Sequence, residues 1–268
     1  MTHAGTYSPN LLYPELSHLI VGASFDVHNG LGPGWNEWDY HRAILDALHN
    51  KNVSAESHLR EHVLHRGDPV DEFELDILVN DQIILELKHI RTPFSAQHYT
   101  QIINYLKRWK KELGMLINYG LERVCCKRVP YSPVKGETAL EGCWNDFKLQ
   151  LPELAEHIHL SAKNILELHG LGYGAETSKK ILLKEFAYQE LNPRIPEVVP
   201  RFNERSFERR PMDSILLDEK VLVSATAFAD TTATDMARLR SGMKQLCIPF
   251  GVLMNFGKSH LTLRGVKL

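Results

Sequence analysis

The two halves of the chain resemble each other in sequence. The run GMLINYG at residues 114–120 recurs as GVLMNFG at 251–257, and the strand pattern around Asp76 recurs around Asp213. All of these matches share an offset of 137 positions. Because one register spans a strand pair, a helix and another strand, the repeat predicts a tandem duplication. We expect a domain at 1–130, an irregular linker at 131–150 and a second, degenerate copy at 151–268.

Each copy is predicted to contain the same order of elements. In the first copy, apolar residues at helical spacing predict helices at 14–27 and 35–50, separated by a glycine turn. Apolar and β-branched runs predict strands at 53–58, 61–66, 73–79 and 82–89. Thr92-Pro93 favours the start of a helix that runs to 113, and 115–119 reads as a buried strand. This order predicts an α/β (α+β) fold with a mixed central sheet flanked by helices.

Composition narrows the class of protein. The chain has 268 residues, 43% of them apolar, and a net charge of −2, so global charge gives no steering toward nucleic acid. It has neither a membrane-spanning apolar run nor a leader pattern, which predicts a cytoplasmic protein with no membrane partner. Its four cysteines lack metal-ligand spacing and are expected to be reduced.

Charged side chains occupy two predicted strands. Glu86 and Lys88 lie two positions apart in the apolar run QIILELK, so they share one face of the strand. Asp76 lies in the strand before. Acids and lysines are poor strand formers and costly to bury unpaired. The set could form either an interior ion pair or a site for a divalent metal and an attacking water.

The loop between these two strands decides whether the acids can meet. Asp76 is directly opposite Glu86 only if the hairpin loop holds an odd number of residues, such as Asn80-Asp81-Gln82. A two-residue turn would place Asp76 opposite Leu85 instead. The metal-site hypothesis therefore predicts an odd loop or a β-bulge here.

With that geometry, the oxygen ligands suit Mg²⁺, with Mn²⁺ as an alternative. Asp76, Glu86 and the Leu87 carbonyl would hold the ion, and Glu37 would complete the shell directly or through water. Glu37 lies in the first turn of the second predicted helix, on the same stripe as apolar residues, so we expect it to point inward. Lys88 would orient the water or offset charge in the transition state.

The next predicted helix carries a polar pair and a basic run. Gln101 and Tyr105 are four residues apart and share a face, which suits a phosphate or water contact at the edge of the site. The basic run surrounds Trp109 and predicts a nucleic-acid contact, although a solvated helix end is the commoner interpretation. It consists of Lys107, Arg108, Lys110 and Lys111.

These motifs together resemble a known family. The run from Gly34 to Tyr40, GWNEWDY, is similar to the signature of the GxxExxY proteins, and Asp76 with Glu86-Leu87-Lys88 resembles the core of the PD-(D/E)XK nuclease superfamily. QIINY at 101–105 is similar to the Q-x-x-x-Y motif of the exonuclease-like branch. The resemblance covers about residues 14–129. It implies a restriction-endonuclease-like αβββαβ core, a Mg²⁺-dependent nuclease site and a DNA or RNA substrate. Of the two nucleic acids, DNA is the expected substrate.

The second copy departs from this pattern. At an offset of 137, Glu86 becomes Val223, Lys88 becomes Ala225, Gln101 becomes Arg238 and Tyr105 becomes Gly242, while Asp213 takes the place of Asp76. One carboxylate cannot hold a catalytic Mg²⁺. The resemblance therefore predicts one active site in the first half and a pseudonuclease domain in the second. The second domain would form an internal pseudo-dimer with the first or extend a nucleic-acid surface, and a homodimer is also possible.

Three functions remain in competition. The first is a Mg²⁺-dependent nuclease that hydrolyses phosphodiester bonds in DNA or RNA. The second is a catalytically inactive binding or assembly protein that keeps the nuclease fold, since fold alone does not imply function. The third is hydrolysis of a phosphorylated small molecule, which needs a closed pocket.

Overall fold

The computed structural model describes residues 11–227 and 231–268, and it divides into two compact units. The first comprises the chain up to His62 together with Glu72–Ser132, and the second comprises Val63–Asp71 together with Pro133–Leu268. No described helix has both the length and the apolar character needed to cross a membrane.

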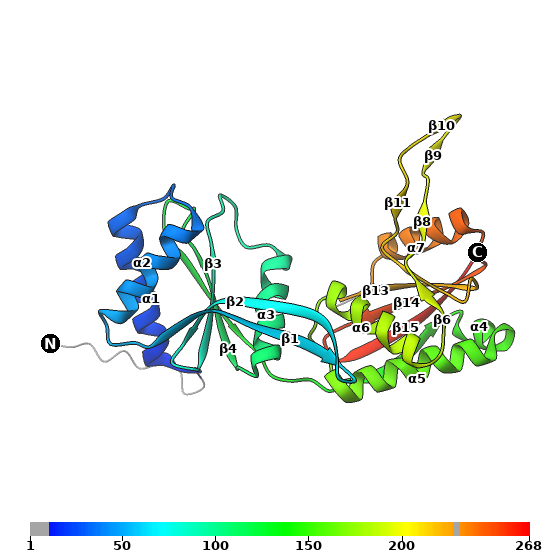
Figure 1. The fold of residues 1–268 in the computed structure, drawn as a ribbon, viewed down its shortest axis with the longest axis horizontal. Helices are drawn as coiled ribbons and strands as arrows, with labels where there is room; N and C mark the ends of the chain where they lie inside the picture. Colours follow the sequence, from blue (N-terminus) through cyan, green and yellow to red (C-terminus); the bar gives the residue numbers. More distant parts are fainter. Residues whose placement is uncertain (1–10, 228–230) are drawn as a thin grey trace. The chain divides into compact units, whose positions relative to one another are not determined.

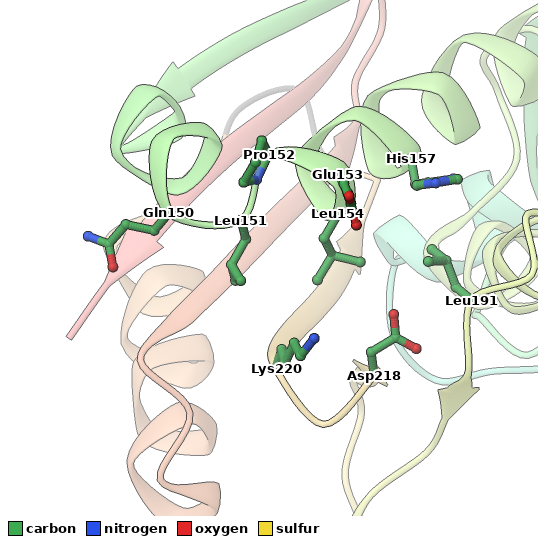
Figure 2. A pocket seen from close by; sticks show the side chains of 9 residues that line it. All are labelled: Gln150, Leu151, Pro152, Glu153, Leu154, His157, Leu191, Asp218 and Lys220. Atoms are coloured by element: carbon green, nitrogen blue, oxygen red, sulfur yellow. The ribbon is translucent and has the colours of Figure 1, made fainter.

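The first unit is a five-stranded mixed sheet between two helical layers (Figure 1). The strand order is β1-β2-β3-β4-β5, in which β3 and β4 are parallel and the pairs β2–β3 and β4–β5 are antiparallel. Helices α1 and α2 cover one face and α3 the other. The elements are α1 Pro14–Leu31, α2 Glu37–His49, β1 Ala55–His65, β2 Asp68–Val79, β3 Ile83–Lys88, α3 Ala96–Trp109, β4 Leu113–Asn118 and β5 Cys125–Pro130.

Alternation along the strands gives each face of this sheet its own apolar core. Leu85 and Ile117 pack toward α1 and α2, whereas Ile84 and Leu116 pack toward α3. Successive side chains of a strand point to opposite faces, so a fully apolar β3 is expected where both faces are covered. Glu86 has the same parity as Ile84 and therefore lies on the α3 face of this buried strand.

The second unit contains a six-stranded sheet in the order β6-β15-β14-β13-β12-β7. Two small two-stranded sheets, β8 with β11 and β9 with β10, project from it (Figure 1). Its helices are α4 Trp144–Gln150, α5 Pro152–His169, α6 Ala175–Tyr188 and α7 Ala233–Leu246. Its strands are β6 Glu137–Gly142, β7 Pro193–Arg194, β8 Glu197–Val198, β9 Arg201–Phe202, β10 Arg205–Ser206, β11 Arg210–Pro211, β12 Ile215–Leu217, β13 Val221–Thr226, β14 Phe250–Phe256 and β15 His260–Lys267.

Several sequence-based boundaries are wrong. The segment 131–150 is not an irregular linker, because it carries β6, which pairs with β15, and α4. The strands expected at 53–58 and 61–66 form one strand, β1, which continues through His58 despite a φ of 55° there. Helix α3 begins at Ala96 because Ser95 and His98 form a capping box, which satisfies its first amides better than Thr92-Pro93 could. Strand β5 was not predicted.

The same backbone features recur in the two units, but not at the predicted constant offset. Asn80 and Asp81 have left-handed φ values of 49° and 54°. Asp218 and Glu219, 138 positions later, have similar values of 48° and 56°. Helices α1 and α5 begin 138 residues apart, whereas α3 and α7 begin 137 apart. The connection before α7 is therefore one residue shorter than the connection before α3. The constant offset of 137 is wrong for the hairpin, and Asp76 corresponds to Ser214 rather than to Asp213.

Candidate active site in the first unit

The hairpin between β2 and β3 has the odd loop that a shared site requires. Val79 pairs with Ile83, and the Gln82 backbone N–H donates to the Val79 carbonyl at 2.9 Å, so three residues form the loop. The pairing of Ile77 with Leu85 follows the same register, and continuing it by one residue places Asp76 opposite Glu86. The predicted three-residue loop is confirmed.

Asp76 is tied to the strand that carries the other charges. Its Oδ2 accepts a hydrogen bond of 2.7 Å from the backbone N–H of Leu87. Burial raises the pKa of Asp76, while this hydrogen bond and the ammonium group of Lys88 act in the opposite direction. The N–H and C=O of one strand residue point to the same side, so the Leu87 carbonyl also faces Asp76.

Glu86 is a completely buried carboxylate with only one partnered oxygen. Its side chain has no exposed surface, and its Oε1 forms an ion pair with Nζ of Lys88. Its Oε2 is buried with no hydrogen-bond partner. Burial, together with the carboxylates of Asp76 and Glu37, raises the pKa of Glu86 to about 8 against the opposing effect of Lys88. A buried carboxylate oxygen with no donor is rare in folded proteins and calls for an explanation.

Lys88 is the positive charge of this group. Burial lowers the pKa of its amine, but the carboxylates of Glu86, Glu37 and Asp76 outweigh that effect and raise it. Lys88 therefore carries a full positive charge at neutral pH. A single ammonium group faces three carboxyl groups, which leaves the cluster short of positive charge.

Glu37 lies near this cluster but does not point into the core. The side chains of Tyr40, Ile44 and Leu48 are fully buried, whereas Glu37 is exposed at the first position of α2. The predicted inward direction is wrong, because Asn36 caps the helix and the first turn remains in solvent. Partial burial nevertheless raises the pKa of Glu37, with Lys88 and Asp76 as its nearest charged influences.

Gln101 and Tyr105 lie together on α3 as predicted. The Gln101 amide donates to the Tyr105 hydroxyl at 2.9 Å, and Tyr105 is buried. Burial and the negative charge of Glu86 raise the pKa of Tyr105, so the phenol stays protonated. The structure thus brings Asp76, Glu86, Lys88, Glu37 and Tyr105 into electrostatic contact.

The ligand set fits a hard divalent cation. The unpartnered Glu86 oxygen, Asp76 opposite it and the Leu87 carbonyl supply oxygen donors to one side of the hairpin. No three His, Cys, Asp or Glu side chains among the described residues are placed to hold a metal ion. Two carboxylates with a carbonyl and water are typical of Mg²⁺, which keeps several waters.

The basic run on α3 is partly engaged in ion pairs within the first unit, and its predicted nucleic-acid contact stays a prediction. Arg108 pairs with Glu61, and Lys111 pairs with Asp81 at the hairpin loop. That loop precedes β3, whereas Glu86 and Lys88 lie at the other end of the strand. Burial lowers the pKa of Lys107 to about 7, and Lys110 is the exposed member of the run.

An aromatic cluster beside Asp76 was missed in the sequence. The Trp38 ring stacks on the rings of His41 and His58, with centroids 5.6 and 5.8 Å away, and 56% of Trp38 is exposed. Nε2 of His41 lies 3.3 Å from the Asp76 carbonyl oxygen. Trp35, 52% exposed, lies on the other side of Glu37 in the chain. Trp35 and Trp38 flank Glu37 in the sequence. Because tryptophan is highly buried on average, two of them at the start of a polar helix were a signal that could have found this cluster.

Comparison with protein families agrees with this geometry. Residues 14–129 match the family described as PD-(D/E)XK nuclease superfamily. The strand order and helical layers of this part of the chain are consistent with a restriction-endonuclease-like fold.

Other comparisons add little. No curated protein matches the chain. A solved structure described as "Crystal structure of SSO0001" matches with 19% identity and a TM-score of 0.27, over 44% of this chain. The chain spans 57% of the length of that solved chain.

Proposed function

We propose that the first unit is a Mg²⁺-dependent nuclease that hydrolyses phosphodiester bonds of nucleic acid, with DNA as the first substrate to test. The observation that carries the proposal is the buried, unpartnered Oε2 of Glu86 opposite Asp76. Burying a carboxylate oxygen without a hydrogen-bond donor is costly, so the fold keeps it at the expense of stability. A cation would relieve that cost, and the superfamily match names the chemistry.

The protein groups divide into three roles. Asp76, Glu86 and the Leu87 carbonyl would hold the ion, which supplies Lewis-acid polarisation of the phosphodiester when bound. Lys88, held next to Glu86, orients the attacking water or offsets negative charge as the phosphate reacts. Glu37 acts from the edge of the site through water, because it is exposed but electrostatically linked to Lys88.

The substrate side of the site favours unpaired bases. Trp38 presents a large exposed ring next to Glu37, and the imidazoles of His41 and His58 support it. Stacking of bases on aromatic side chains is sequence-tolerant and suits single strands. A single-stranded or frayed end is therefore the proposed form of substrate.

The second unit is proposed to be a degenerate copy without nuclease activity. In the register that the hairpin geometry supports, Asp76, Glu86 and Lys88 correspond to Ser214, Ser224 and Thr226. Without carboxylates at these positions the second unit has no equivalent ligand set.

The four cysteines, all free, agree with a protein of a reducing, cytoplasmic environment.

Cleavage of end-labelled oligonucleotides with Mg²⁺ or Mn²⁺ tests the proposal. Wild type should cleave, and Glu86→Ala and Lys88→Ala should reduce the rate at least about 100-fold, as expected for loss of a metal ligand or an electrostatic group. Glu56→Gln, an exposed carboxylate on β1, is the matched control and should cleave like wild type. Equal residual activity in all four proteins would indicate a contaminant and remove the nuclease proposal.

The alternative is an inactive nuclease-fold protein that binds nucleic acid. The exposure of Glu37, which leaves Asp76 and Glu86 as the carboxylates of the hairpin, is the observation that favours it. Oligonucleotide binding without cleavage, at any divalent metal tested, would support this alternative over the nuclease.

A further inference from the structure

The second unit has a cavity where the first unit has its carboxylates. Its volume is about 290 Å³. It is lined by Ser224 and Leu253, which pair across β13 and β14. The equivalent pair across β3 and β4 in the first unit is Glu86 and Leu116. The other lining residues used below are Arg210, Asp213, Ser214, Thr226, Asp235 and Arg238.

Hydroxyl groups have replaced the charges of the hairpin. The Ser214 and Ser224 hydroxyl oxygens lie 2.7 Å apart, in the positions that correspond to Asp76 and Glu86. Thr226 corresponds to Lys88, and its hydroxyl donates to the side chain of Asn255 at 2.9 Å. Hydroxyls both donate and accept, so Ser214 and Ser224 offer donors where the carboxylates of Asp76 and Glu86 offer only acceptors.

Two guanidinium groups add positive charge to the cavity. Arg238, on α7, stands in the position of Gln101, and Arg210 comes from β11. Neither forms an ion pair with any residue in the part of the chain that the structure describes. The guanidinium group is the side chain best suited to phosphate, because its planar donors match two phosphate oxygens.

The acidic residues of the cavity are already engaged. Lys179 forms an ion pair with Asp213 and also reaches Glu176. Asp235 is buried and accepts hydrogen bonds from the backbone N–H and the hydroxyl of Thr232, which cap α7. Neither carboxylate therefore offers a free pair of oxygens to a cation, and the cavity favours an anion.

We propose that this cavity binds a phosphate group of a nucleic-acid strand without a metal ion and without cleaving it. Ser214 and Ser224 would donate to the phosphate oxygens, and Arg238 and Arg210 would neutralise the charge. The preference for phosphate rests on the cavity alone. The choice of a nucleic-acid strand as its source rests on the proposed function of the first unit.

Binding in EDTA tests this site separately from the nuclease. The full chain would be titrated into a fluorescein-labelled single-stranded oligonucleotide, and anisotropy would be recorded. Arg238→Gln, which restores the residue type of the first unit, should weaken binding about tenfold, as expected for one charge-assisted contact. Arg240→Gln is the matched control, because Arg240 is exposed on the same helix but does not line the cavity. It should bind like wild type.

A second set of measurements distinguishes the source of the phosphate. Inorganic phosphate and thymidine monophosphate would be titrated while the NMR signals of the Ser214 and Ser224 amides are followed, with Ser224→Ala as a second variant. Shifts with inorganic phosphate, thymidine monophosphate and the oligonucleotide support a general phosphate site, and shifts with the oligonucleotide alone support strand recognition. Equal binding by Arg238→Gln and Arg240→Gln, with no amide shifts, overturns the inference. Wild-type cleavage in Mg²⁺ is scored independently, so its failure concerns only the first unit.

Discussion

Asp76 accepts a 2.7 Å hydrogen bond from the backbone N–H of Leu87, across the hairpin that joins β2 to β3. This contact gives the carboxylate a fixed orientation before any ligand arrives. It also occupies one carboxylate oxygen, so Asp76 can bind a metal ion only through its negative charge and its other oxygen.

The substitution Asp76→Asn separates these two contributions. An asparagine oxygen can still accept from Leu87, so we expect the unfolding free energy to change by less than about 1 kcal/mol. Removing the charge should lower metal-dependent cleavage at least about 100-fold, because a carboxylate ligand is lost. Cleavage and urea denaturation would be measured on the same preparation. A variant that cleaves like wild type would show that Asp76 holds the hairpin rather than the metal.

Glu86 should make the metal-free protein less stable as pH rises. Its pKa is about 8 in the folded state, above the value of 4.5 for the free side chain. Between these values the folded state binds more protons than the unfolded state, so the unfolding free energy falls with rising pH. Glu86→Gln should flatten this dependence, which urea denaturation in EDTA between about pH 5 and about pH 8 would measure.

The exposed carboxylate of Glu56 gives the control for this titration. Glu56→Gln should keep the wild-type slope, because it replaces an exposed carboxylate and leaves Glu86 in place. Parallel curves for wild type and Glu86→Gln would mean that Glu86 is ionised throughout this range, with Lys88 as a sufficient partner. Added Mg²⁺ should stabilise wild type more at the upper end of the range, since ligands bind a metal when deprotonated.

How far the sequence predicts this molecule depends on the range of the interactions involved. Strand alternation and the odd loop at Asn80–Gln82 follow from local rules, so the placement of Asp76 opposite Glu86 was predictable. The direction of Glu37 was not, because helix capping by Asn36 outweighs the apolar stripe. The ion pair between Lys111 and Asp81 was not predictable either, because the two residues are 30 positions apart in the sequence. The connection before α7 is one residue shorter than the connection before α3, so matching by sequence placed every residue of the second hairpin one position too early. The left-handed φ values of the two hairpin loops show this difference.

Trp38 is expected to contribute binding of single strands rather than cleavage chemistry. Stacking of one base on an aromatic side chain is worth about 1–3 kcal/mol, so Trp38→Ala should weaken oligonucleotide binding in EDTA by about fivefold to 100-fold. Phe25, also an exposed aromatic residue of the first unit, is the control, and Phe25→Ala should bind like wild type. Equal affinities for both variants would place the substrate elsewhere on the unit.

Glu185 is expected to control the stability of the second unit. It has no exposed surface. Its carboxylate accepts hydrogen bonds from His65 and Arg66, at the tip of the β1–β2 hairpin, and from Asn164 on α5 and Gln189 at the end of α6. Burial alone would raise the pKa of Glu185, but these donors lower it to about 2. A depressed pKa contributes stability above the unfolded value of 4.5, which is lost as pH falls toward 2.

Replacing this carboxylate leaves the Arg66 guanidinium without its partner. Glu185→Gln should therefore destabilise the unit by about 3–5 kcal/mol at neutral pH, as for other broken buried ion pairs. Hydrogen exchange followed by mass spectrometry would locate the loss, since amides of α6 should exchange faster while those of α3 stay protected. Glu156→Gln, an exposed change on α5, should leave both helices unaffected. Unchanged protection of α6 in Glu185→Gln would mean that packing, rather than this hydrogen-bonded charge, holds the helix in place.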